Sequence, residues 1–168
     1  ADYLANYKNK KVLVIDADPQ FNATQGLLEE YKKLQELEKE LKATNEEERL
    51  KELEEKLKEH DSEKDITYYT EHILKNKKTI YQLFQPQRDM TESFKTPDSS
   101  ELIVELLENN RLDILCGDLN LVLANKNSDY SLIKRIKNFI ADNNLKSVYD
   151  YIFIDCPPTL TIYTDSAL

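Results

Sequence analysis

Three short apolar runs, each ending in an acid or followed by a turn signal, constrain the fold of this chain more than any other feature. They are residues 11–16 (KVLVID), 112–116 (LDILC, then Gly117) and 151–155 (YIFID, then Cys-Pro-Pro). Their apolarity is continuous rather than alternating, which is typical of strands buried on both faces of a parallel sheet. We therefore predict an α/β fold in which helices cover both faces of a parallel sheet.

Helical patterns lie between these runs. Residues 131–145 place an apolar stripe on one side and charges outside it, which predicts an amphipathic helix that leads back into the third strand. The stripe is Leu132, Ile133, Ile136, Phe139 and Ile140, and the outer residues are Lys134, Arg135 and Lys137. Residues 65–84 also look helical, and residues 85–100 are predicted to be a loop because prolines and small polar residues interrupt any period.

Residues 25–64 differ in kind, because they are highly charged and carry leucines at heptad spacing. Leucines recur at 27, 34 and 41 in a first arm and at 50, 53 and 57 in a second arm. Thr44 and Glu47 form a capping-box pattern that favours a new helix start between the arms. We predict a helical hairpin or coiled-coil insertion at 25–64 within an α/β domain that spans 1–168. One unbroken helix of about 60 Å, at 1.5 Å per residue, is the alternative.

Composition excludes several classes of protein. A formal net charge of −9 disfavours a broad basic surface for nucleic acid or anionic membrane. No apolar run approaches the roughly 20 residues that cross a bilayer, so we expect no membrane association. The two cysteines, Cys116 and Cys156, are too few for a disulfide scaffold and indicate a cytoplasmic protein.

Carboxylates stand where a parallel sheet collects its ligands. Asp16 and Asp155 each end a predicted strand, and Asp18 follows two residues after the first. Ligands gather at the carboxyl ends of parallel strands. Mg²⁺ prefers one or two protein carboxylates and keeps several waters. Asp18 lies far enough along the chain to face a phosphate or an attacking water. The three acids therefore predict a metal-phosphate site.

The segments VLVIDADPQFNAT, LDILCGDLNL and DYIFIDCPP together resemble the ParA, Soj and MinD-like family of deviant Walker A partition ATPases. The resemblance implies a P-loop NTPase-like fold with ATP and Mg²⁺ as cofactors. It makes Asp18 the catalytic residue that orients the hydrolytic water. It places Asp16 beside the Mg²⁺ water shell and makes Asp155 the Walker B carboxylate. It places Pro19, Gln20 and Asn22 in the first switch loop and Pro157 at the start of the second. It assigns cofactor binding to Asp16, Gln20, Asn22 and Pro157.

The resemblance also implies a biological role. The intact protein is expected to be an ATP-dependent switch in plasmid or chromosome partitioning. We expect it to form a homodimer in the ATP state, to meet a centromere-binding partition protein and to bind DNA nonspecifically. The implied location is the cytoplasm, in association with the nucleoid.

The chain departs from the family pattern in one respect. Such ATPases carry a KGGxGKT-type loop whose backbone N–H groups cradle the phosphates. This chain has two glycines, Gly26 and Gly117, and neither lies in such a loop. We therefore expect a fragment that lacks the Walker A loop and the C-terminal DNA-binding part, and that is inactive by itself. Two alternatives stay open: a phospho-acceptor receiver module with Asp155 as acceptor, and a noncatalytic interaction protein that acts through residues 25–64.

Overall fold

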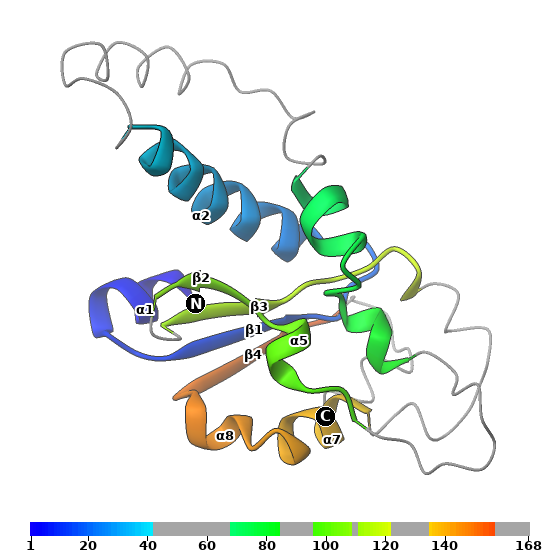
Figure 1. The fold of residues 1–168 in the computed structure, drawn as a ribbon. Helices are drawn as coiled ribbons and strands as arrows, with labels where there is room; N and C mark the ends of the chain where they lie inside the picture. Colours follow the sequence, from blue (N-terminus) through cyan, green and yellow to red (C-terminus); the bar gives the residue numbers. More distant parts are fainter. Residues whose placement is uncertain (42–67, 85–95, 109–110, 122–134, 157–168) are drawn as a thin grey trace.

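A four-stranded sheet with helices on both faces forms the body of the protein (Figure 1). The computed structural model describes residues 1–41, 68–84, 96–108, 111–121 and 135–156, and of residues 33–41 only the backbone. One face carries α1 (Asp2–Lys8) and α2 (Asn22–Leu41), and the other carries α7 (Arg135–Asp142) and α8 (Leu145–Val148). The predicted α/β architecture is confirmed.

The strand order places the first predicted strand inside the sheet. β1 (Val12–Asp16) pairs in parallel with both β3 (Leu112–Leu115) and β4 (Tyr151–Asp155). β2 (Val104–Leu107) pairs antiparallel with β3, which gives the order β2-β3-β1-β4. The three apolar runs are therefore the three parallel strands. Sequence analysis did not predict β2, whose outward Glu105 alternates with buried Val104 and Leu106, as in a half-exposed antiparallel strand.

Burial follows the prediction in β1 and β3 but not in β4. Every residue of β1 and β3 is buried. In β4, Tyr151 and Phe153 are 44% and 42% exposed, and only Ile152 and Ile154 pack against the core. The prediction that the third run is buried on both faces is therefore wrong. The reason is that β4 is an edge strand in the described part of the chain, which an apolar run alone does not reveal.

The predicted helix at 131–145 is present in part. α7 buries Ile136, Phe139 and Ile140 and exposes Lys137, as the pattern predicted. Arg135, expected outside, is buried. The helix ends before 145 because Asn144 takes a left-handed conformation with φ 52°, and α8 follows. Residues 131–134 of the prediction lie outside the described residues.

The first arm of the predicted hairpin is helical and begins earlier than expected. α2 starts at Asn22, and its first turns place Leu28 and Tyr31 in the core against the sheet. The beginning of this arm is therefore part of the domain core. The second arm and the break at Thr44 lie outside the described residues, so the hairpin stays a prediction.

The segment after the charged region is less regular than predicted. Residues 65–84 were expected to be one helix, but the described part holds two short ones, η1 (Tyr69–Leu74, a π-helix) and η2 (Ile80–Leu83, a 3₁₀-helix). Lys77 between them has φ 55°, which interrupts a continuous helix. The loop predicted to extend to residue 100 ends earlier, because α5 (Ser99–Leu102) begins after Asp98, whose side chain accepts a hydrogen bond from Ser100 N.

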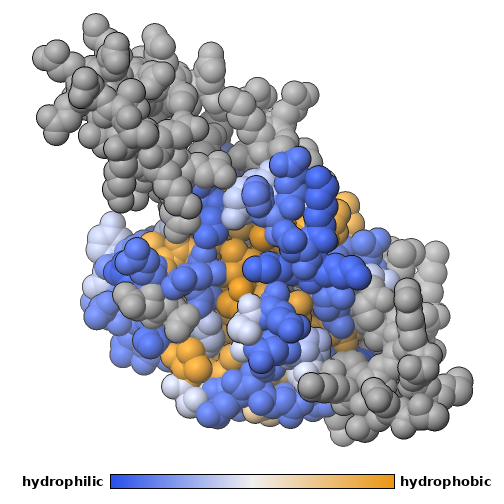
Figure 2. Space-filling model, in the orientation of Figure 1, coloured by the Kyte–Doolittle hydropathy of each residue, from blue (hydrophilic) through white to orange (hydrophobic). Residues whose placement is uncertain are grey.

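Two apolar clusters hold the layers together, one on each face of the sheet. The cluster under α7 and α8 includes Leu13, Ile15 and Phe139, and the cluster under α1 and α2 includes Val12, Val14 and Ile114. Alternate residues of β1 thus supply both clusters, as expected of a strand covered on both faces. Figure 2 shows hydrophobic residues (orange) among hydrophilic ones across the middle of the molecule, in the same view as Figure 1.

Candidate functional site

Two of the predicted site residues meet at one end of the sheet. Asp16 ends β1 and Asp155 ends β4, and the two residues are paired in the parallel register. Ala17 N donates a 2.8 Å hydrogen bond to Asp155 O, so the pairing continues past the last strand residue. Asp16 is fully buried whereas Asp155 is exposed. The two strand-end carboxylates are therefore neighbours with different access to solvent.

The Asp16 carboxylate is held by three hydrogen bonds. Its Oδ2 accepts bonds from Thr24 N at 2.8 Å and from Thr24 Oγ1 at 2.7 Å. Its Oδ1 accepts one from Asp18 N at 3.2 Å. Burial raises the pKa of Asp16 to about 6 and the nearby charge of Asp155 adds to the rise, while the three hydrogen bonds oppose it. Asp16 thus joins the start of α2 to the backbone that carries Asp18.

Asp18 lies in a short turn after β1. Its side chain is half-buried, and its Oδ1 accepts a 2.9 Å hydrogen bond from Gln20 N, which forms an Asx turn. Its carbonyl accepts a second bond from Phe21 N at 2.9 Å. The exposed side chains of Gln20 and Asn22 contact each other, with Asn22 Nδ2 3.4 Å from Gln20 Oε1. The turn is therefore ordered by its own residues, and Asp18 keeps its Oδ2 without a bond to a described residue.

Phe21 closes this turn in an uncommon conformation. Its φ of 44° lies in the left-handed region, which disfavours residues with a bulky side chain. Its ring stacks on Tyr69, with centroids 4.9 Å apart and planes 15° from parallel. Gly117 makes room for it, because a Cβ on Gly117 would lie 2.6 Å from the Cβ of Phe21. The backbone of the turn is thus held against the residues that follow β3.

The turn at Gly117 and Asp118 follows β3 and bonds Thr24, Tyr69 and Thr79. The sequence alone did not indicate a role for it. Gly117 N donates to Thr24 Oγ1 at 2.7 Å, and Gly117 O accepts from the Tyr69 hydroxyl at 2.9 Å. The Asp118 carboxylate accepts from Thr79 Oγ1 at 2.7 Å. The available signals were the position of one of only two glycines directly after an apolar strand and the threonine in the NAT sequence.

The carboxylates of Asp16 and Asp155 suit a magnesium ion held through its waters. They suit an ion bound directly to Asp16 less well. Oδ2 of Asp16 already accepts two bonds, and Oδ1 retains one acceptor position, enough for a metal-bound water. Asp155 is exposed and can bind a cation or its water. Among the described residues there is no group of three His, Cys, Asp or Glu side chains that could hold a metal. Magnesium, which keeps several waters, needs no such group. Pro157 lies outside the described residues.

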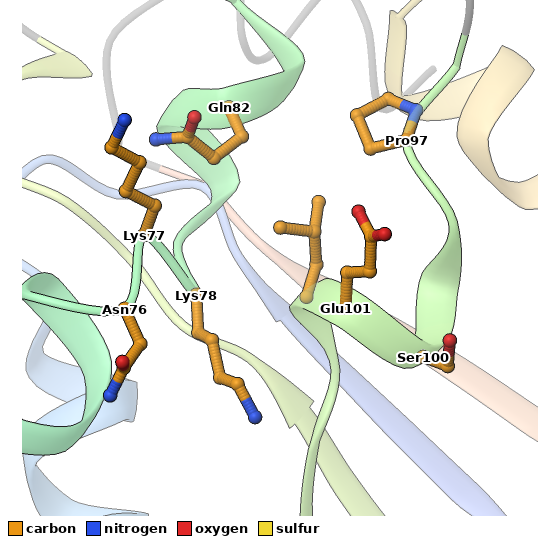
Figure 3. A pocket seen from close by; sticks show the side chains of 8 residues that line it. Asn76, Lys77, Lys78, Gln82, Pro97, Ser100 and Glu101 are labelled. Atoms are coloured by element: carbon orange, nitrogen blue, oxygen red, sulfur yellow. The ribbon is translucent and has the colours of Figure 1, made fainter.

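The larger described hollow lies away from the three acids. It has a volume of about 770 Å³ and is lined by residues 76–78 and 82 on one side and by residues 97 and 100–102 on the other (Figure 3). Lys77, Lys78 and Glu101 contribute charges of both signs to its wall. A second hollow of about 620 Å³ lies between α7, α8 and β4. Neither is lined by Asp16, Asp18 or Asp155.

The chain matches a known protein family over its whole length. A family model described as an AAA domain matches residues 1–168. No curated protein matches the sequence significantly. None of the described helices combines the length and apolar composition needed to cross a bilayer.

Several solved structures share the fold. A plasmid partition protein from Borrelia burgdorferi is 23% identical with a TM-score of 0.58, and the match covers 99% of this chain and 51% of that one. A plasmid partition protein from the same organism, bound to AMPPNP, is 22% identical with a TM-score of 0.59 and coverages of 99% and 48%. A protein from Corynebacterium diphtheriae is 19% identical with a TM-score of 0.51 and coverages of 97% and 49%.

The chain spans about half the length of these solved chains. Their likeness confirms the P-loop NTPase-like fold expected from the ParA-like resemblance, and the family match covers the whole chain. This chain therefore belongs to the AAA domain family, in the fold that plasmid partition proteins share.

Proposed function

We propose that this chain is part of an ATP-hydrolysing switch protein that acts in plasmid or chromosome partitioning. The observation that carries the proposal is the pairing of Asp16 and Asp155 at neighbouring strand ends, with the Asp18 turn anchored to Asp16. Membership of the AAA domain family and the likeness to partition proteins, one of them bound to AMPPNP, support it. The family match also favours a nucleotide-binding protein over a receiver module.

Each candidate site residue has a separate role in phosphoryl transfer to water. Asp18, half-buried and with an Oδ2 that bonds no described residue, orients the attacking water and accepts its proton. Asp155 and Asp16 would hold a magnesium ion through its waters, and a bound ion would supply positive charge to neutralise the phosphates. Gln20 and Asn22, exposed on the turn after Asp18, contact the nucleotide. Pro157 begins the second switch loop.

The proposal extends to assembly. We propose an ATP-dependent homodimer, a centromere-binding partner and nonspecific DNA binding. The net charge of −9 disfavours a broad basic surface for DNA on this chain itself. A cytoplasmic location in association with the nucleoid follows from that role.

The test is a pair of substitutions in the full-length gene product that contains this chain. Asp18→Asn preserves shape and the acceptor for Gln20 N but removes the charge, so kcat should fall at least about 100-fold while nucleotide affinity changes little. Asp150→Asn is the matched control, since this exposed aspartate precedes β4, at the end opposite Asp155, and bonds Lys10 and Lys11. It should leave kcat unchanged. Hydrolysis that persists in the Asp18→Asn protein contradicts the assignment.

A further inference from the structure

Thr24 is a polar residue with no exposed surface, and it lies between three parts of the chain. It is the third residue of α2 and is fully buried. Its Oγ1 is 2.7 Å from both Asp16 Oδ2 and Gly117 N. A backbone N–H can only donate, so the hydroxyl accepts from Gly117 and must direct its own hydrogen to the Asp16 carboxylate. Both of its hydrogen-bonding roles are therefore fixed by its neighbours.

These bonds fix the orientation of Asp16. Thr24 supplies two donors to the same oxygen, Oδ2, which leaves Oδ1 turned to the Asp18 backbone at 3.2 Å. Bonds to an ionised carboxylate are among the strong ones in proteins. The position of the Asp18 N–H thus depends on a carboxylate that the Thr24 hydroxyl holds in place.

Capping of the helix does not by itself require this hydroxyl. The bond from Thr24 N to Asp16 Oδ2 already satisfies a free N–H in the first turn of α2. The hydroxyl adds a link between Asp16 at the end of β1 and Gly117, which follows β3 and lies 93 positions after Thr24 in sequence. Without it, the buried Gly117 N–H would lose its acceptor and Asp16 would lose one of its three donors.

We propose that Thr24 is a positioning residue, whose hydroxyl sets the Asp16 carboxylate and the Asp18 turn in the geometry that ATP hydrolysis requires. This inference rests on the proposed function. Because Thr24 has no exposed surface and bonds Asp16, its loss should act through Asp16 and the Asp18 turn, and so affect the chemical step, where Asp18 acts, more than nucleotide binding. A misplacement of about 1 Å in a reacting group lowers rates by up to about 100-fold.

The experiment compares three variants of the full-length gene product. Thr24→Val keeps the shape and removes the hydroxyl, and Thr24→Ser keeps the hydroxyl. Thr79→Val is the matched control, because Thr79 is also buried and donates to a buried carboxylate, Asp118, at a similar 2.7 Å. We expect Thr24→Val to lower kcat by about 10- to 100-fold with KM within about threefold, Thr24→Ser to restore kcat, and Thr79→Val to leave it unchanged.

Amide hydrogen exchange gives a second readout that needs no nucleotide. In Thr24→Val, exchange at the Gly117 and Asp18 amides should accelerate about tenfold, whereas Thr24→Ser should resemble the unsubstituted protein. A kcat that survives Thr24→Val, or that falls equally in Thr79→Val, overturns the proposal. If the unsubstituted protein hydrolyses no ATP, the proposed function fails instead. Exchange then decides the positioning role: unchanged rates at Gly117 and Asp18 overturn it, and faster rates uphold the control of the turn by Thr24.

Discussion

Replacing each of the two glycines by alanine should change stability in opposite directions. A Cβ on Gly117 would lie 2.6 Å from the Cβ of Phe21, 3.0 Å from Cγ of Asp16 and 3.1 Å from its Oδ2. A Cβ on Gly26, an exposed residue within α2, would meet nothing within 4 Å. The same added methyl group therefore enters a filled space in one variant and open space in the other.

The magnitudes follow from these contacts. The Phe21 Cβ is fixed to the backbone and Asp16 is held by Thr24, so neither neighbour of Gly117 can rotate away. Overpacking of this kind destabilises by about 1–3 kcal/mol. Alanine at Gly26 instead stabilises an exposed helix position by about 0.5–1 kcal/mol. The two variants should therefore differ by roughly 1.5–4 kcal/mol, or between about 3 and 16 °C in Tm for a chain of this size.

Urea denaturation and thermal melts followed by circular dichroism measure both variants under the same conditions. Gly26→Ala should melt above the unsubstituted protein and Gly117→Ala below it. A Gly117→Ala protein as stable as the unsubstituted one would refute the close approach between the Asp18 turn and the end of β3. A destabilised Gly26→Ala protein would instead refute the helical start of α2.

Two further predictions concern other buried polar groups. Burial raises the pKa of Asp113, which accepts a hydrogen bond from the Tyr149 hydroxyl, to about 6, above an unfolded value of about 3.9. The stabilising contribution of Asp113 is complete below pH ~4 and is lost as pH rises through 6. In urea titrations, the free energy of unfolding should therefore decline between pH 4.5 and 7.5, and Asp113→Asn should reduce that decline by about 2 kcal/mol. Tyr69→Phe removes the bond to Gly117 O but keeps the stack on Phe21, and the free energy of unfolding should fall by about 1 kcal/mol; Tyr69→Leu, which loses both, should fall further.

Much of the fold was predictable from the sequence because it is encoded locally. The apolar runs gave the three parallel strands, and the spacing of Ile136, Phe139 and Ile140 gave the buried face of α7. The edge position of β4 was not predictable, because a run such as YIFID describes its own residues and not its neighbours in the sheet. β2 was missed for a related reason: with only four residues, of which Glu105 is exposed, its pattern is too short to indicate a strand by itself.

The candidate site divides in the same way. The acids at 16 and 155 could be predicted to lie together, since both end parallel strands, and the register pairs them. Thr24 and Gly117 carry no comparable signal, because the bond between them joins positions 93 residues apart and repeats with no period. The acids required by the proposed chemistry can thus be predicted from the ends of the apolar runs. The contacts that orient them, however, come from a helix start and a strand end that only the folded sheet brings together. The Thr24 hydroxyl is therefore the most informative single group to remove, since it bonds the predicted acid and the unpredicted glycine at once.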